Sequence, residues 1–597
     1  MSMSMSSVTS SWKAYGKIDE AEQQRLEARR KSRKRIVIIS LSSIFLVAVI
    51  VGAVVGTVSH HHDGSAGTGG EAASSISNSI KAACKVTLYP DSCYTSLYAM
   101  VNSSNFDTPN LAKLSVQVAM TELSKVSGKV SQLQSQGKLD KISAAALQNC
   151  IELTDLAIYH LNDTLYSSNW GQLTTLEAVD DLRTWLSAAG TNQQTCLDGL
   201  ENSSQELQAT MARYTLNSTE FTSNSLALVT AISDIASSIN LRRRRLMSSS
   251  GTTSTSHNVD DSDGEHPMPR WLTSKDRKLL QSNSAAADAM VVIVAKDGSG
   301  NYTTIGAALN ALPEKSSKRI IIHVKKGVYT EKVIVDKSKW NVMMVGDGMN
   351  VSIVSGSLNV VDGTPTFSSA TVAVFGKGFI ARDIGFRNTA GAIKQQAVAL
   401  LSAADESVFY RCSIDAFQDT LYTHSLRQFY CECDIYGTVD FIFGNAAVVF
   451  QNCNIWARVP LSGQQNTITA QGKIDPNQNT GISIHNCTIS AFGNLASVNS
   501  YLGRPWKNYS TTVYMRSTMG SFINPAGWLS WMGNTPPTTI FYAEFRNLGL
   551  GSSTKNRVKW KGLRKLTLRQ ARQFTVGSFI QGNNWLPQAG VTYRSGM

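Results

Sequence analysis

A short unit that ends in Cys-x-Ile recurs in the C-terminal half of the chain and constrains its fold most strongly. The runs FYRCSI, CECDI, FQNCNI and IHNCTI end at residues 414, 435, 455 and 489. Their last cysteines lie 21, 20 and 34 residues apart, among short β-rich runs broken by Gly, Asn and Asp. A β-rich repeat of about 20 residues is typical of a parallel β-helix in which each repeat forms one coil. We therefore predict an all-β, right-handed parallel β-helix over residues 289–597.

The repeated cysteines are expected to face the interior, because equivalent residues of successive coils stack on one another. Cys453 would pair with Cys487, and Cys412 with Cys433, where their coils are neighbours. Cys431 is then left over. The alternative is that all five are buried free thiols, which pack as small apolar groups.

Two aspartates follow the first two repeated cysteines at the same distance. Asp419 lies seven residues after Cys412, and Asp440 lies seven residues after Cys433. If the coils stack in register, the two carboxylates sit on neighbouring strands about 5 Å apart. Such a pair can supply an acid, a base or a nucleophile to one ester or one glycosidic bond.

The N-terminal end has the pattern of a targeting segment. Residues 1–35 are polar and end in the basic run RLEARRKSRKR, whereas the 23 residues of 36–58 carry no charge. An uncharged run of that length can span a bilayer as a transmembrane helix, and the basic flank predicts a cytosolic N-terminus. A signal-anchor is one interpretation and a cleaved signal peptide is the other. Both send the remainder into the secretory pathway, where eight Asn-x-Ser/Thr sites fit a glycoprotein.

Residues 76–240 have the pattern of a helical domain. Apolar residues at 147, 151, 158, 161 and 165 step by 4, 7, 3 and 4, which places them on one helix face. A small four-helix bundle is the expected architecture. Two disulfides between the cysteines nearest in sequence are expected in a luminal protein, from the four candidates Cys84, Cys93, Cys150 and Cys196.

The segment 241–288 is predicted to be an exposed linker, because it lacks apolar periodicity. It carries basic pairs near its two ends, Arg244 with Arg245 and Arg277 with Lys278. Exposed linkers are preferred sites of proteolysis. We expect cleavage here by a subtilisin-like processing protease.

The excess positive charge lies entirely in the C-terminal part. The chain holds 56 basic and 43 acidic residues, of which 30 and 17 lie from residue 281 onward. A basic secreted domain favours a polyanionic partner. Nucleic acid is not expected, because the chain has no zinc-finger or RNP-type motif. No cofactor or metal is expected either, since the sequence holds no HExxH motif and no tight aspartate cluster.

Several further motifs surround the two aspartates. They are QAVAL with Gln396, QDTLY with Gln418, GTVDFIFG with Asp440 and LGRPW with Arg504. Together with VAKDGSGNYTTI at 294–305 and GVYTE at 327–331, they resemble the plant pectin methylesterases. The helical block resembles the inhibitor-like pro-region of that family, and the basic pairs resemble its processing sites.

The resemblance implies unequal roles for the two aspartates. Asp440 corresponds to the nucleophile that attacks the C6 methyl ester of a galacturonosyl unit. Asp419 corresponds to the acid that protonates methanol and then to the base that activates water. Asp419 must start protonated, so burial and the neighbouring charge are expected to raise its pKa. Because Gln418 directly precedes Asp419, both can serve one site only if the chain turns or bulges there.

The resemblance also assigns the surrounding side chains. Gln396 and Gln418 correspond to the amide donors that stabilise a tetrahedral oxyanion. Arg504 corresponds to the arginine that holds the nucleophile. Trp506 is similar to a sugar-stacking residue, and Thr366 to a substrate contact.

The implied function is hydrolysis of the methyl esters of homogalacturonan (pectin) in the plant cell wall. The implied enzyme is a monomer, which reaches the wall from a membrane-anchored Golgi precursor and touches membrane only through its N-terminal segment. Its pro-region is expected to inhibit it, and separate proteinaceous inhibitors are possible partners. A glycosidase on polygalacturonan is the alternative enzyme, because carboxylates about 5–5.5 Å apart also suit a retaining glycosidase. A non-catalytic protein that inhibits other esterases is a third hypothesis.

Overall fold

The computed structural model describes residues 69–100, 108–135, 139–173, 175–247, 290–533 and 535–597. The predicted membrane segment 36–58 lies outside these residues. Within the described part of the chain, no helix combines the length and the apolarity needed to cross a membrane. The chain divides into two compact units, residues 1–85 with 101–108, and residues 86–100 with 109–597. Helix α2 (Gly69–Cys84) belongs to the first unit.

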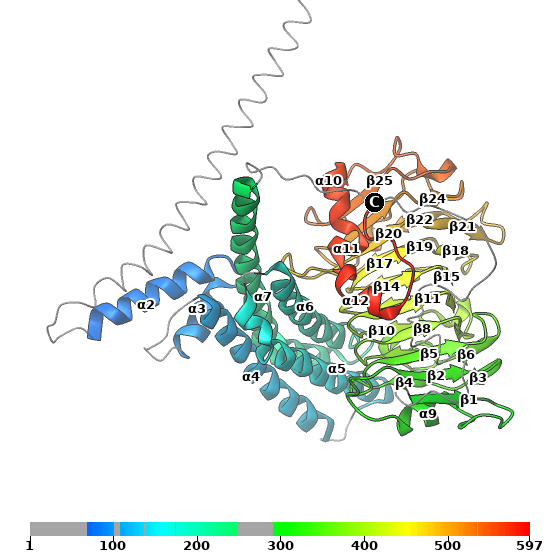
Figure 1. The fold of residues 1–597 in the computed structure, drawn as a ribbon, viewed down its shortest axis with the longest axis horizontal. Helices are drawn as coiled ribbons and strands as arrows, with labels where there is room; N and C mark the ends of the chain where they lie inside the picture. Colours follow the sequence, from blue (N-terminus) through cyan, green and yellow to red (C-terminus); the bar gives the residue numbers. More distant parts are fainter. Residues whose placement is uncertain (1–68, 101–107, 136–138, 174, 248–289, 534) are drawn as a thin grey trace, which may run out of the picture. The chain divides into compact units, whose positions relative to one another are not determined.

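The second unit begins with the predicted helical part. Its helices are α3 (Pro90–Tyr98), α4 (Thr108–Ser135), α5 (Lys141–Leu165), α6 (Leu176–Asp198) and α7 (Gln205–Met247). The side chain of Asp140 caps α5 by accepting hydrogen bonds from two backbone N–H groups, and Thr175 caps α6 in the same way. Helix α5 packs along α6, and α6 along α7 (Figure 1). We call residues 109–247 the helical region.

The apolar face predicted for residues 147–165 lies on α5. Leu147, Leu161 and Leu165 are buried there, whereas residues 151 and 158 are half-buried. The predicted disulfide between Cys150 of α5 and Cys196 of α6 is confirmed. Cys84 and Cys93 are also disulfide-bonded.

Helix α7 ends later than the sequence pattern predicted. It runs to Met247, so the backbone at Arg244 and Arg245 is helical and does not belong to an extended linker. Arginine is a good helix former, which allows the helix to continue after its apolar pattern stops. The other basic pair, Arg277 with Lys278, lies outside the described residues.

Residues 290–565 form the predicted coils, and every pair of neighbouring strands is parallel. The eleven-stranded sheet contains, in spatial order, β1 (Met290–Val294), β2 (Ile320–Val324), β5 (Val342–Gly346), β8 (Ile380–Arg382), β11 (Ser407–Tyr410), β14 (Arg427–Cys431), β17 (Ala447–Gln451), β20 (Gly481–His485), β23 (Thr511–Met515), β25 (Phe541–Phe545) and β26 (Leu563–Lys565). The seven-stranded sheet contains β22 (Ser500–Gly503), β19 (Asn466–Gln471), β16 (Ile442–Gly444), β13 (Leu421–Thr423), β10 (Leu400–Ser402), β7 (Val372–Val374) and β4 (Val333–Val335). The eight-stranded sheet contains β24 (Thr518–Met519), β21 (Thr488–Phe492), β18 (Asn454–Arg458), β15 (Asp434–Gly437), β12 (Ser413–Asp415), β9 (Gly385–Asn388), β6 (Ser352–Gly356) and β3 (Gly327–Thr330).

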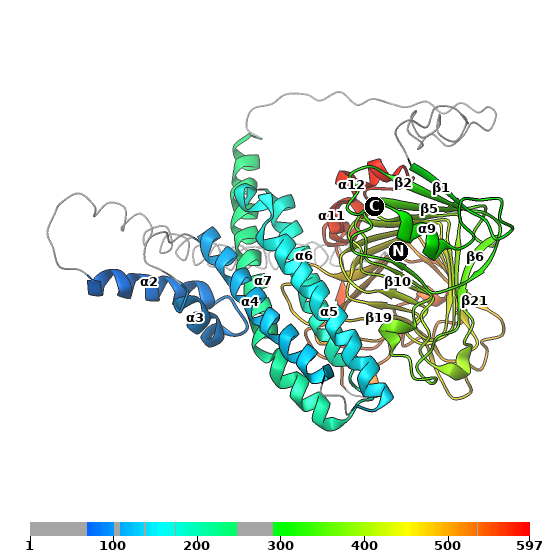
Figure 2. The ribbon, with the colours of Figure 1, turned by 90° about the horizontal axis from the view of Figure 1, so that it is seen from below.

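The three sheets enclose an interior (Figure 2). Rows of buried side chains fill it. Phe409, Tyr430 and Phe450 stack as one such row, with ring centroids 4.6 and 4.7 Å apart. The main hydrophobic core draws its buried members from residues 292–542 only, so the β-helix has a core of its own. Helix α9 (Ile305–Ala311) contributes to this core at the first coil.

The repeated cysteines form one interior row without disulfides. The strand register pairs position 412 with 433, 433 with 453 and 453 with 487, and all four thiols are buried and free. The predicted pairs Cys412–Cys433 and Cys453–Cys487 are therefore wrong, and the alternative of buried thiols is correct. Stacked residues of parallel strands point in the same direction about 4.8 Å apart, which does not suit the short Cβ–Cβ separation of a disulfide. Cys431, also free, faces the other side of its strand.

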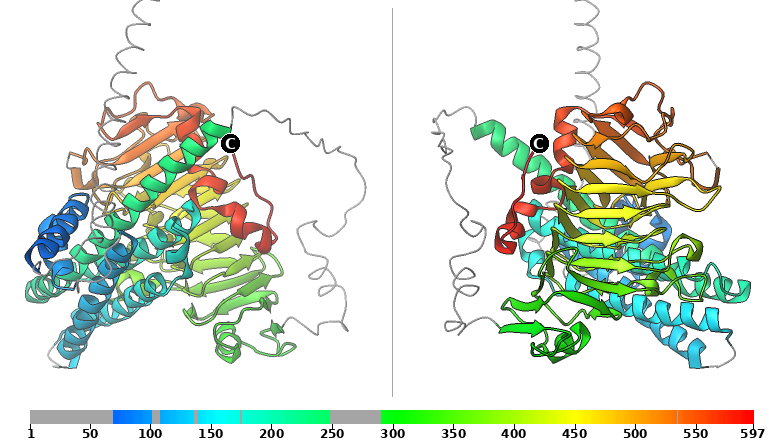
Figure 3. Two further views of the ribbon diagram at one scale, coloured as in Figure 1. Left: turned by 60° about the vertical axis from the view of Figure 1, so that its left-hand side comes forward. Right: turned by 90° about the vertical axis from the view of Figure 1, so that its right-hand side faces the viewer.

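The C-terminal helices cover the outer face of the eleven-stranded sheet (Figure 3). They are α10 (Leu568–Ala571), α11 (Val576–Phe579) and α12 (Gly582–Ala589). Trp585 and Leu586 of α12 belong to one apolar cluster with Phe429 and Val449 of that sheet. The helical region instead contacts the loops at the ends of the seven-stranded sheet, where the candidate residues lie.

Candidate active site

Asp419 and Asp440 occupy equivalent positions before two neighbouring strands. Leu421 of β13 pairs with Ile442 of β16, and each of these residues is the first of its strand. Each aspartate lies two residues earlier, so the register predicted from the equal spacing is observed. Neighbouring strands are about 4.8 Å apart, which brings both carboxylates within reach of a single substrate group.

The backbone turns at each aspartate. Asp419 has a φ of 60° and Asp440 a φ of 50°, both in the left-handed region. On a regular strand Gln418 and Asp419 would face opposite sides, and this turn interrupts that alternation. Gln418 in turn forms a parallel bridge with Gln396 of the preceding coil. The side-chain oxygen of Gln396 is buried and has no hydrogen-bond partner among the described residues.

Two side chains fix the carboxylate of Asp440. Arg504, just after β22, donates from Nε to Oδ1 at 2.9 Å and to Oδ2 at 3.1 Å, and from Nη2 to Oδ2 at 2.7 Å. Thr467 of β19 donates from Oγ1 to Oδ1 at 2.6 Å and accepts from the Asp440 N–H at 2.9 Å. A planar arginine fork binds a carboxylate in one orientation, so Asp440 is held in a fixed position. Thr467 belongs to none of the recognised motifs, although it pairs with the strand position of Asp440.

Asp419 has a different environment from its neighbour. It is buried, and burial, followed by the charge of Asp440, raises its pKa well above the ordinary value, whereas Arg504 opposes the shift. A raised pKa keeps this carboxyl protonated to a higher pH, as a general acid requires. The expectation of a raised pKa from burial and the neighbouring charge is confirmed.

An aromatic wall lies beside the carboxylates. Tyr422 and Phe443, on the two strands that follow the aspartates, stack with ring centroids 4.1 Å apart. The ring of Trp506 lies 6.2 Å from that of Phe443. It also packs against Gly472, where a Cβ atom would fall 2.8 Å from the Trp506 ring. Glycine at this position therefore allows Trp506 to lie flat against the backbone.

Thr366 directly precedes Phe367, whose ring lies 5.5 Å from that of His424. Thr366 begins the short helix η2 (Thr366–Ser369), where its carbonyl accepts a hydrogen bond from the Ser369 hydroxyl at 2.8 Å. Among the described residues it makes no recorded contact with Asp419, Asp440 or Arg504. Its role as a substrate contact stays a prediction.

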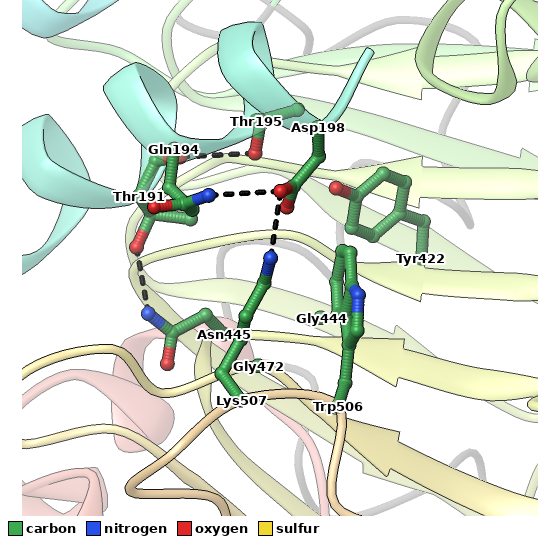
Figure 4. Close-up of a pocket in the computed structure, with 10 residues that line it drawn as sticks. All are labelled: Thr191, Gln194, Thr195, Asp198, Tyr422, Gly444, Asn445, Gly472, Trp506 and Lys507. Atoms are coloured by element: carbon green, nitrogen blue, oxygen red, sulfur yellow. Dashed lines mark hydrogen bonds and ion pairs between the residues drawn. The ribbon is translucent and has the colours of Figure 1, made fainter. Parts of the chain in front are cut away.

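Helix α6 of the helical region covers one end of the aromatic wall (Figure 4). Asp198, the last residue of α6, accepts a hydrogen bond from Lys507 Nζ at 2.6 Å and another from Gln194 at 2.8 Å. One turn away, Thr195 bonds the ring of His424 at 3.0 Å. The residues that line this small pocket are Thr191, Gln194, Thr195, Asp198, Tyr422, Gly444, Asn445, Gly472, Trp506 and Lys507.

A buried arginine joins the helical region to the coils a second time. Arg427 of β14 donates from Nη2 to Asp405 at 2.7 Å and from Nη1 to Asp181 of α6 at 2.7 Å. Although burial raises the pKa of Asp405, the pairing with Arg427 holds it well below its usual range. The indole of Trp185 also donates to Asp405, at 3.2 Å. No sequence motif marks the contacts of Asp181 and Trp185, because they join segments more than 200 residues apart.

Within the residues that the structure describes, no group of three or more His, Cys, Asp or Glu side chains is arranged to hold a metal ion.

In comparisons with known proteins, the coils and the helical part of the chain each match a separate family model. The family model "Pectinesterase" matches residues 291–583, and the model "Plant invertase/pectin methylesterase inhibitor" matches residues 78–228. The chain is 52% identical to "Probable pectinesterase/pectinesterase inhibitor 46" of Arabidopsis thaliana, over 98% of this chain and 99% of that protein. It is 48% identical to "Pectinesterase 3" of Phaseolus vulgaris, over 98% of this chain and 99% of that protein.

A solved structure also matches the part of the chain that forms the coils. The pectin methylesterase from carrot is 51% identical, with a TM-score of 0.51, and the match covers 53% of this chain and 100% of the carrot chain.

Proposed function

Because this chain belongs to the pectinesterase family, as a carboxylic ester hydrolase with an inhibitor-like helical domain, we propose that it removes methyl groups from homogalacturonan, the backbone of pectin. The observation that carries the proposal is the unequal environment of two matched carboxylates. Arg504 and Thr467 orient Asp440 as an attacking group. Burial keeps Asp419 protonated, as a proton donor to the leaving group.

In the first half of the proposed reaction, an Asp440 oxygen attacks the carbonyl carbon of the methyl ester. The tetrahedral oxyanion accepts hydrogen bonds from the Gln396 and Gln418 amides. When this intermediate collapses, the bond to the methoxy oxygen breaks, and that oxygen takes the proton of Asp419 and leaves as methanol. The galacturonosyl carbonyl is now bonded to Asp440.

In the second half, the ionised Asp419 takes a proton from water, whose oxygen attacks the same carbonyl carbon. The bond to Asp440 breaks, and the galacturonosyl unit is released as a carboxylic acid that is still part of the polysaccharide and ionises in solvent. Asp419 is protonated again and Asp440 is ionised, so both are ready for another turnover.

The test uses enzyme cut from the full chain. A site-specific protease sequence replaces residues 275–280, the purified chain is cut, and the helical part is removed by ion exchange. The β-helix has its own hydrophobic core, so we expect this activated enzyme to remain folded. It should release methanol from esterified pectin without new reducing ends, which a glycosidase would create.

The Asp440→Ala variant of the activated enzyme should lose methanol release by more than a thousandfold. Asp434→Ala is the matched control, because Asp434 lies on the same coil but on the eight-stranded sheet and bonds Asn454. Activity of Asp440→Ala close to that of Asp434→Ala would refute the proposed nucleophile.

We also infer that the uncut chain is self-inhibited. Trp506 and Lys507 line a pocket that α6 closes, and Asp198 is ion-paired with Lys507 there. A polysaccharide cannot occupy the aromatic wall while α6 covers it.

Charge reversal at Asp198 tests this inference. The full-length Asp198→Lys variant should show higher methanol release than the full-length parent, because two ammonium groups repel each other. Asp155→Lys is the control, since Asp155 is an exposed residue of α5. Equal activity of the parent and Asp198→Lys, with the activated enzyme much faster than both, would show that this ion pair does not maintain inhibition.

We also propose how the precursor is targeted, cut and delivered. Residues 36–58 would hold or target it in the secretory pathway, as a Golgi precursor that can be glycosylated. A subtilisin-like protease would cut at a basic pair, and the monomeric product would act in the cell wall. Immunoblots of secreted protein with an antibody against residues 290–597 test this order: wall protein of full length would contradict it.

A further inference from the structure

Arg458 is the last residue of β18, and its side chain reaches back to the end of β12, two strands away on the eight-stranded sheet. Its Nη1 donates to Oδ1 of Asp415 and, at 3.0 Å, to the carbonyl oxygen of Ala416. Its Cζ atom lies 4.0 Å from the centroid of the Phe417 ring. One side chain therefore contacts three consecutive residues. The two residues that follow them are the proposed amide donor and the proposed acid.

The arginine also spans the coil that carries Asp440. Strand positions 437 and 457 pair, so Arg458 lies level with Thr438, two residues before Asp440. The N–H of Thr438 donates to the carbonyl of Phe417 at 2.8 Å. Arg458 thus begins on the far side of one catalytic turn and ends on the other.

The guanidinium of Arg458 is enclosed by groups that fix its plane. The ring of Phe492 lies on a second side, with its centroid 5.8 Å from Cζ. The side chains of Arg458 and Asp415 are 22% and 24% exposed, so water screens the pair only partly. A planar guanidinium that both stacks on aromatic rings and bonds oxygen atoms has little freedom to turn. Its contacts with the Ala416 carbonyl and the Phe417 ring therefore hold the backbone of the turn as well as a carboxylate.

The turn beyond these residues has a backbone that needs such support. Asp419 has a φ of 60°, in the left-handed region, where a residue with a side chain remains only when its surroundings hold it. Hydrogen bonds from the Asp419 N–H to Val439 at 3.0 Å and from the Ala397 N–H to Gln418 at 3.2 Å hold the later part of the turn. Arg458 holds the part that leads into it.

We propose that Arg458 is a positioning residue for ester hydrolysis, which acts through residues 415–417 on the amide of Gln418 and the carboxyl of Asp419. Among the described residues it makes no recorded contact with either of these side chains. An oxyanion donor must lie within about 2.7–3.1 Å of the developing charge, so a small displacement of the turn weakens it. This inference rests on the proposed esterase function and adds a residue to its machinery.

The experiment compares three variants of the activated enzyme with a matched control. Arg458→Met removes the guanidinium, Arg458→Lys keeps the charge on a single nitrogen, and Phe417→Leu removes the ring beneath it. Arg387→Met is the control, because Arg387 donates to the other oxygen of Asp415, at 3.1 Å, and makes no recorded contact with described residues 416 and 417. The kcat and KM for methanol release and the melting temperature are measured for each variant.

We expect Arg458→Met to lower kcat by about 100-fold, the usual effect of a misplacement of about 1 Å at a reacting centre. KM should stay within twofold of the parent, because the loss concerns contacts made in the transition state. Arg458→Lys should lose about tenfold, since one nitrogen cannot bond the carboxylate and the carbonyl while stacking on the ring. Phe417→Leu should lose several-fold, and Arg387→Met should behave as the parent.

A second measurement separates positioning from a general loss of folded enzyme. Arg458→Met is combined with Gln418→Ala, and its effect on kcat is compared with and without that change. If Arg458 acts through Gln418, the factor lost should be several-fold smaller when the amide is already absent. A loss of folded enzyme would reduce the rate by the same factor in both backgrounds.

The proposal is overturned if Arg458→Met keeps kcat within twofold of the parent, if its loss appears in KM alone, or if Gln418→Ala leaves its effect unchanged. An equal loss in Arg387→Met would also overturn it, since that result assigns the effect to Asp415 alone. Should Arg458→Met fail to fold, the same criteria apply to Arg458→Lys and Phe417→Leu. Failure of the proposed esterase function gives a different result, because the parent enzyme would then release no methanol.

Discussion

Replacing Arg504 by lysine tests whether the geometry of this side chain, and not only its charge, makes Asp440 reactive. Arg504 makes three contacts with Asp440, at 2.7, 2.9 and 3.1 Å, from two nitrogens of one planar group. Lysine preserves the charge but has a single nitrogen, so it cannot hold both oxygens in one plane. Thr467 continues to donate to Oδ1 in the variant.

The size of the effect follows from these contacts. The side chains of Arg504 and Asp440 are 19% and 8% exposed, so water screens their interaction weakly. Loss of one charge-assisted hydrogen bond costs about 2 kcal/mol, which corresponds to about 30-fold in kcat if the bond positions the transition state. Arg504→Met removes the charge as well and leaves a buried carboxylate unpaired, at a cost of about 3–5 kcal/mol.

The assay is the initial rate of methanol release by the activated enzyme, together with a melting temperature for each variant. Arg387→Lys is the control for an arginine-to-lysine change, because Arg387 of the eight-stranded sheet makes a single contact with Asp415, from Nε to Oδ2 at 3.1 Å. We expect Arg504→Lys to lie between the parent and Arg504→Met in kcat, with a small loss of stability. A kcat within twofold of the parent, or one as low as that of Arg504→Met, would refute the geometric argument.

Three further outcomes are expected. Because burial and the charge of Asp440 raise the pKa of Asp419, its ionisation removes stability as the pH rises through the folded-state pKa. Asp419→Asn should therefore have a higher melting temperature than the parent at pH 8 and the same melting temperature near pH 4, close to the unfolded-state pKa of about 3.9. The reverse trend would contradict the raised pKa of Asp419. Gly472→Ala places a Cβ atom 2.8 Å from the Trp506 ring, so it should raise KM several-fold through displacement of that ring. Gly596→Ala is the control for a glycine substitution, because the added atom meets nothing within 4 Å there. Titration of the denatured, unreduced chain with a thiol reagent should find the five free cysteines of the β-helix, and a value of one would restore the predicted disulfides.

The repeat was sufficient to predict the fold and the register of the catalytic pair. Asp419 and Asp440 follow Cys412 and Cys433 at equal spacing. They therefore have the same register before β13 and β16, because each coil adds one strand to each sheet. The same regularity misled the disulfide prediction. Periodicity identifies which residues stack, but whether two stacked thiols can bond depends on the direction of their Cα–Cβ bonds, which parallel strands keep aligned.

The contacts of the helical region could not be predicted in the same way. Asp198 and Lys507 are separated by 309 residues, and neither lies in a repeat or at a marked spacing. Arg427 appears in the sequence as one more basic residue. Its pairing with both Asp405 and Asp181 follows only from the positions of β14 and α6 in the fold. Thr467 was missed because it lies in none of the recognised motifs. Its register with Asp440 follows from the strand pairing of β16 and β19.

The surface that α6 covers is joined to it mainly by polar groups. Thr191 bonds Asn445, Gln478 bonds the carbonyl of Ser187, and Arg183 bonds the carbonyl of Asn477. Each of these groups can exchange its protein partner for water when the two surfaces separate, which favours a reversible separation. A precursor held by such contacts can therefore separate into its two parts after one cut, as each polar group regains a water partner.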